Sequence, residues 1–99
     1  MGWATNHIAA LQEGRTVQCR PKGNSMTGRI NSGDLVTIEP IVHDPRVGNI
    51  VLCKVRGNQY LHIVTAQKGE QFQISNNHGF VNGWCSRQHI YGIVTEVKK

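Results

Sequence analysis

The feature that most constrains the fold is a pair of strand-like segments, 49–55 and 60–65, joined by a short turn. The first segment, Asn-Ile-Val-Leu-Cys-Lys-Val, is nearly all apolar and rich in β-branched residues. That composition is typical of a strand in the middle of a sheet. The turn contains Gly57-Asn58, a dipeptide that favours a two-residue hairpin connection. The sequence therefore predicts an antiparallel β-hairpin, with a sheet built around it.

Shorter segments on both sides of this hairpin carry similar signals. We expect further strands at 17–19, 35–39, 71–75 and 90–97. Residues 3–13 have the apolar spacing of a short amphipathic helix that ends at Gly14. Asn82-Gly83 predicts a turn. Several short strands with one small N-terminal helix predict an all-β or β-rich fold, and 99 residues allow one domain over 1–99.

Composition narrows the possible functions. Eleven Lys and Arg against six Asp and Glu give a formal net charge of +5, which permits attraction to nucleic acid or another acidic surface. The three cysteines are odd in number and widely spaced, which favours a reducing compartment over a disulfide framework. No apolar run is long enough for a membrane anchor, so we expect a cytoplasmic protein. Close pairs of metal ligands are absent, so we expect no metal and no cofactor.

The stretch from Gly23 to Val36 is the candidate functional segment. It opens with the turn Gly23-Asn24 and closes with the turn Ser32-Gly33-Asp34, and Ser25-Met26 lies between them. A serine on such a bend can be presented as a nucleophile. The alternative is a serine that caps a short helical turn through its side-chain oxygen.

The whole pattern is more specific than its parts. Gly-x-Ser-Met, then Ile four residues after Met26, then Gly-Asp and an apolar pair, resembles the serine-nucleophile box of LexA-like regulators and signal peptidases. The segment Gly48-Asn49-Ile50-Val51 resembles the Gly-Asp-Ile-Val that precedes the hairpin in that superfamily. The resemblance runs from about residue 16 to residue 97. It implies a LexA/signal-peptidase-like β fold and a serine that attacks a peptide carbonyl.

The same resemblance indicates a base for Ser25. In LexA-like proteins a lysine on the second strand of a comparable hairpin follows the serine at about the distance of His62. In archaeal and endoplasmic-reticulum signal peptidases a histidine takes that place. A neutral imidazole can accept a hydroxyl proton directly near neutral pH, because its ordinary pKa is about 6.5. The expected catalytic pair is Ser25 and His62; the alternative is a strand histidine that only fills space.

A serine nucleophile also needs donors for the oxyanion that forms on the attacked carbonyl. The candidates are backbone N–H groups at Ser25 and its neighbours, with Asn24 and Met26 beside it. The side chain of Met26 is otherwise expected to pack in the core.

A group that orients the imidazole is the last part of the expected site. Signal peptidases of the histidine type carry aspartates in a Gly-Asp-Asn-Asn segment and again a few residues later. This chain has Ser75-Asn76-Asn77 and then Asn82, so the acids are absent. Ser75, Asn76 or Asn77 are the candidates to orient His62, with less electrostatic help than a carboxylate gives.

These observations predict a soluble serine peptidase-like protein that acts on a peptide or protein, in a bacterial or phage regulatory setting. The alternative is a catalytically inactive binding module of the same fold. Its basic residues Arg15, Arg20, Lys22 and Arg29 would then contact protein or nucleic acid, although a solvated surface explains such residues too. The sequence specifies no substrate and no oligomeric state.

Overall fold

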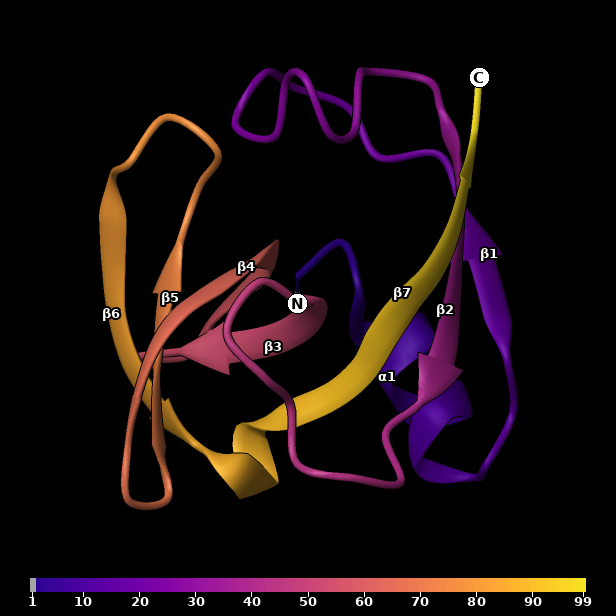
Figure 1. Cartoon of the computed structure of the whole chain (residues 1–99). Coiled ribbons are helices and arrows are strands. Elements are labelled where there is room, and N and C mark those ends of the chain that lie inside the picture. Colours follow the sequence, from indigo (N-terminus) through magenta and orange to yellow (C-terminus); the bar gives the residue numbers. More distant parts are fainter. Residues whose placement is uncertain (1) are drawn as a thin grey trace.

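A computed structural model describes residues 2–99 as one antiparallel sheet with a small helix packed against it (Figure 1). The elements are α1 (Thr5–Gln12), β1 (Val17–Cys19), β2 (Leu35–Pro40), β3 (Ile50–Val55), β4 (Asn58–Lys68), β5 (Gln71–Ser75), β6 (Val81–Ser86), the 3-10 turn η1 (Arg87–His89) and β7 (Ile90–Lys98). The seven strands lie in the order β1-β2-β7-β3-β4-β5-β6. The predicted β-rich fold with one short N-terminal helix is confirmed.

The β3–β4 hairpin lies at the centre of the sheet, since β3 pairs with both β4 and β7. Its turn differs by one residue from the prediction. Val55 pairs with Asn58, so the two turn residues are Arg56 and Gly57 rather than Gly57 and Asn58. Both have positive φ angles, 52° and 82°, as a type I′ turn requires.

The prediction of a turn at Asn82-Gly83 is wrong, because both residues lie inside β6. The β5–β6 ladder pairs Ile74 with Gly83 and Ser75 with Val81, which leaves Asn82 as an extra residue in a β-bulge. Gly83 has a φ of 142°, a conformation that glycine adopts easily. A dipeptide typical of turns is thus used to bend a strand, and the bend directs the Asn82 side chain.

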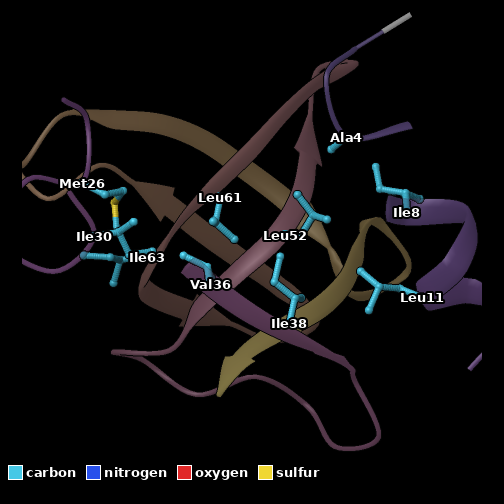
Figure 2. Packing of buried hydrophobic residues seen from close by; sticks show 10 residues of the cluster. All are labelled: Ala4, Ile8, Leu11, Met26, Ile30, Val36, Ile38, Leu52, Leu61 and Ile63. Atoms are coloured by element: carbon cyan, nitrogen blue, oxygen red, sulfur yellow. The ribbon is translucent and has the colours of Figure 1, made fainter. Parts of the chain in front are cut away.

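Two clusters of buried side chains pack on the two faces of the hairpin. One contains Ala4, Ile8, Leu11, Met26, Ile30, Val36, Ile38, Leu52, Leu61 and Ile63 (Figure 2). The other contains Val51, Cys53, Val55, Val64, Phe72, Ile74, Cys85 and Ile90. Alternate residues of β3 and β4 enter alternate clusters, as the period of a strand dictates. The first cluster also holds the segment that carries Ser25.

Candidate active site

Ser25 lies in a turn between β1 and β2 that is anchored to the core at two points. Met26 and Ile30 are buried, and the Ile30 N–H donates to the Met26 carbonyl at 2.8 Å. The Thr27 N–H donates to the Asn24 carbonyl at 3.2 Å. A single helical turn with two apolar anchors four residues apart therefore presents the exposed Ser25 beside a buried Met26.

The structure brings Ser25 and His62 within hydrogen-bonding distance. The Ser25 Oγ lies 3.1 Å from His62 Nε2. His62 comes from β4 and is only 7% exposed, and the Tyr60 ring packs on it with 4.9 Å between ring centroids. The Ser25 hydroxyl is engaged with the imidazole and makes no capping bond to its own turn. An accessible hydroxyl therefore touches a buried base.

Asn82 sets the tautomer of His62. The Asn82 Oδ1 lies 2.6 Å from His62 Nδ1. An amide oxygen only accepts hydrogen bonds, so Nδ1 carries the proton and Nε2 is left free to accept one from Ser25. Burial lowers the pKa of His62 below its ordinary value, and the bond to Asn82 partly opposes that shift. His62 is thus neutral at neutral pH, in the tautomer that a general base needs.

The three residues expected to orient His62 have other partners. The Ser75 Oγ bonds the Thr65 Oγ1 at 2.8 Å and makes no hydrogen bond to the His62 ring. The Asn76 Oδ1 accepts the backbone N–H groups of His78 and Phe80 and so closes the β5–β6 loop. The side chain that hydrogen bonds to His62 Nδ1 is that of Asn82, which the bulge directs toward the ring. Interpreting Asn82-Gly83 as a bulge rather than a turn would have found it.

Asn77 holds the turn that carries Ser25 and makes no hydrogen bond to His62. Its backbone N–H donates to the Ser25 carbonyl at 2.8 Å, and its Nδ2 donates to the Thr27 carbonyl at 2.7 Å. Its Oδ1 accepts from Arg29 Nε at 3.1 Å. His78 Nε2 adds a bond of 2.7 Å to the Asn24 carbonyl. The β5–β6 loop therefore fixes the turn that carries Ser25.

Backbone donors are available next to the Ser25 hydroxyl. Within residues 2–99, the N–H groups of Ser25 and Met26 donate to no acceptor. Both lie at the start of the helical turn, where N–H groups lack intrahelical partners. The carbonyl of Asn24 is occupied by Thr27 and His78, so Asn24 stabilises the turn. The oxyanion role of Ser25 and Met26 stays a prediction.

Ser25 and His62 open onto a cleft of about 830 Å³. Apolar and aromatic side chains make up much of its wall, among them Trp3, Met26 and Tyr60. The charged side chains that line it are Arg20 and Lys22, and no acidic residue of the described chain does so. The cleft is therefore large enough for part of a peptide and carries positive charge.

Ser86 and His89 form a second serine–histidine pair, in different surroundings. The Ser86 Oγ lies 3.1 Å from the His89 Nδ1, the same separation as in the first pair. His89 is exposed on η1, and no residue within 2–99 hydrogen bonds to its other ring nitrogen. The first pair differs in its buried base, in the partner on Nδ1 and in the cleft beside it.

Cys19, Cys53 and Cys85 are free thiols. Within residues 2–99 no three His, Cys, Asp or Glu side chains come together as a metal site. No helix in the same range has both the length and the apolar character needed to cross a bilayer.

The comparisons with known proteins give one family. A family model described as Peptidase S24-like matches residues 5–95. The match includes both Ser25 and His62 and extends from the start of α1 into β7. Comparison with curated proteins gives no match.

Proposed function

Because this chain belongs to the Peptidase S24-like family, we propose that it is a serine peptidase with Ser25 as nucleophile and His62 as general base. The observation that carries the proposal is the 3.1 Å contact between Ser25 Oγ and His62 Nε2. The hydrogen bond from His62 Nδ1 to Asn82 supports it, because it leaves Nε2 unprotonated. The likeness to LexA-like regulators adds a bacterial or phage regulatory setting to the proposal.

The reaction follows from these positions. Ser25 Oγ forms a bond to the carbonyl carbon of a peptide in the cleft while His62 Nε2 takes its proton. The N–H groups of Ser25 and Met26 stabilise the oxyanion. The imidazolium then protonates the leaving amine, and the C–N bond breaks to give an acyl-Ser25. Water, deprotonated by His62, attacks the ester and releases the acid and free Ser25.

The rate is expected to be low. A carboxylate on Nδ1 would stabilise the imidazolium by charge, whereas the Asn82 amide does so only by its dipole. Exchange of a triad carboxylate for an amide that imposes the wrong imidazole tautomer costs about 10⁴ in turnover. Asn82 keeps the correct tautomer through its oxygen, so the loss here should be smaller than that. A single-turnover acylation is therefore the appropriate assay.

The test is labelling by a fluorophosphonate probe, followed by intact mass and peptide mapping. We expect one adduct, on Ser25, that is abolished in Ser25→Ala and strongly reduced in His62→Ala. Ser86→Ala is the matched control, since its hydroxyl lies equally close to an imidazole. The Ser86→Ala protein should be labelled to the same extent as the unaltered protein. No adduct, or an adduct on Ser86, would refute the assignment.

A second candidate is a binding module without activity. The observation that favours it is the cleft lined by Arg20 and Lys22 with no acidic residue beside them. Nucleic acid bound there would be released by salt, because each neutralised phosphate frees counterions. Fluorescence anisotropy with short DNA and RNA tests this. Binding that weakens in Arg20→Ala/Lys22→Ala, with no adduct on Ser25, would favour this candidate.

A further inference from the structure

We propose that Asn82 is a deamidation site, and that the aspartate it yields completes the Ser25–His62 pair as a three-residue charge network. The chemical conversion depends only on Asn82, Gly83 and His62. The gain in activity rests on the proposed function of Ser25. The two parts are therefore tested by separate measurements.

The dipeptide supplies the reactivity. Asn82-Gly83 is the only Asn-Gly in the sequence. The Gly83 backbone nitrogen loses its proton to water and adds to the Asn82 Cγ. The Cγ–Nδ2 bond then breaks as the Nδ2 group takes up a proton, and ammonia leaves a five-membered succinimide. Water then opens the ring at either carbonyl to give aspartate or isoaspartate. Water is the only co-reactant, and Gly83 has no side chain to hinder the ring closure.

The strand geometry leaves room for the reaction. Asn82 is the extra residue of the bulge and has no partner of its own on β5. β6 is the last strand of the sheet, so it has one neighbouring strand instead of two. A bulge locally interrupts the ladder. The segment is thus less constrained than a regular strand in the sheet interior.

His62 assists succinimide formation at Asn82 Oδ1, the atom on which negative charge develops. Its Nδ1–H donates to Asn82 Oδ1 at 2.6 Å. As the Gly83 nitrogen adds to Cγ, that oxygen becomes an oxyanion, and a hydrogen bond to an anion is stronger than one to a neutral amide. The hydrogen bond that fixes the tautomer therefore also lowers the barrier to succinimide formation.

The aspartate product lies at the position that a triad acid requires. Its carboxylate would accept the same Nδ1–H and stabilise the imidazolium by charge. Isoaspartate extends the backbone by one carbon and displaces the carboxylate, so only the aspartate fraction gains activity. Deamidation would convert a slow serine–histidine pair into a faster triad, once and without reversal.

The first experiment follows the conversion in the unaltered protein. Folded protein is incubated at mildly alkaline pH and mapped over time by peptide mass spectrometry with electron-transfer fragmentation. We expect the amide-to-acid mass shift at Asn82 before any at Asn24 or Asn31, whose serine neighbours make them the best internal comparison. His62→Leu should slow it. An Asn82 that remains intact while Asn24 or Asn31 converts would overturn the proposed site.

The second experiment measures the consequence directly. Asn82→Asp should acylate Ser25 faster than the unaltered protein, by less than about 10⁴-fold, because the His62 tautomer is already correct. Asn58→Asp adds the same charge at the exposed first residue of β4 and should leave the rate unchanged. Conversion of Asn82 with no gain in Asn82→Asp would overturn the completed network. A gain in Asn82→Asp with no conversion would overturn the modification alone, and no adduct in either protein would overturn the proposed peptidase instead.

Discussion

Replacement of Asn82 by leucine isolates the contribution of one hydrogen bond to the proposed chemistry. Leucine has the same branching as asparagine but cannot accept the Nδ1–H of His62, and the Nδ1 atom lies 2.6 Å from the Asn82 oxygen. When Ser25 attacks, His62 becomes a positively charged imidazolium. The hydrogen bond from His62 Nδ1 to Asn82 then has a charged donor. Such bonds contribute about 1.5–3 kcal/mol. The acylation rate should therefore fall about 10- to 150-fold.

The pH dependence gives the same variant a second signature. The base must be neutral, so the rate rises with pH and levels off above the His62 pKa. Burial lowers the pKa of His62 more than the hydrogen bond to Asn82 raises it, so the net shift is downward from 6.5. The unaltered protein should therefore have its midpoint below 6.5. Without Asn82 the midpoint should move to still lower pH. A structural disturbance alone has no reason to shift the midpoint in that direction.

The assay is the rate of Ser25 acylation under single-turnover conditions across the pH range. Asn58→Leu, a change at the exposed first residue of β4, is the control and should keep both the rate and the midpoint. An Asn82→Leu protein with an unchanged rate would refute the orienting role of Asn82. A midpoint that moves to higher pH would refute the tautomer assigned to His62.

Two further substitutions test how the nucleophile is held. Asn77→Ala removes the side-chain hydrogen bonds to Thr27 and Arg29. The acylation rate should therefore fall, while the pH midpoint stays unchanged. An unaltered rate would mean that the turn carrying Ser25 is rigid without the β5–β6 loop. Met26→Ala empties a buried anchor that is 5% exposed, so chemical denaturation should show a loss of about 2–5 kcal/mol, and a loss well below this range would contradict the packing argument.

Local patterns predicted most of the fold because they act over few residues. The apolar run of β3 and its turn specify the hairpin, and alternation along β4 places Tyr60 and His62 on one face. The Ser-Met box, with an apolar residue four positions later, predicts the anchored turn of Ser25. The resemblance to LexA-like proteins and signal peptidases, in which the base lies on the second hairpin strand, then indicates His62 among the five histidines.

The parts that escaped prediction depend on the register of β5 and β6. Asn76, Asn77 and Asn82 are chemically alike and close in sequence, so composition cannot say which one reaches His62. The bulge sets these positions. Asn82 hydrogen bonds to His62, Asn77 hydrogen bonds to the turn that carries Ser25, and Asn76 hydrogen bonds within its own loop. A shift of one residue in a strand moves every side chain to the opposite face of the sheet. Asn82-Gly83 is typical of a turn, so the sequence does not indicate that a bulge in β6 makes such a shift there.

Asn82→Asp should also reverse how folding stability depends on pH. In the unaltered protein the pKa of His62 is lowered by folding, so the unfolded chain binds more protons just below pH 6.5. This contribution to stability therefore rises with pH and is complete above 6.5. A carboxylate at position 82 raises the pKa of His62. The folded state then binds the extra proton, and the stabilisation is present below the unfolded pKa of about 6.5 and is lost as pH rises through the folded value.

Urea denaturation between mildly acidic and mildly alkaline pH measures this difference. The difference in unfolding free energy, Asn82→Asp minus the unaltered protein, should favour the variant at acidic pH and fall with rising pH. Asn58→Asp serves as the control, because its exposed carboxylate is not in contact with His62 and should give a flat difference. A flat difference for Asn82→Asp as well would mean that position 82 does not interact with the imidazole. The orienting role of Asn82 and the charge network proposed from its deamidation would then both be wrong, while the Ser25–His62 contact would remain to be judged by labelling alone.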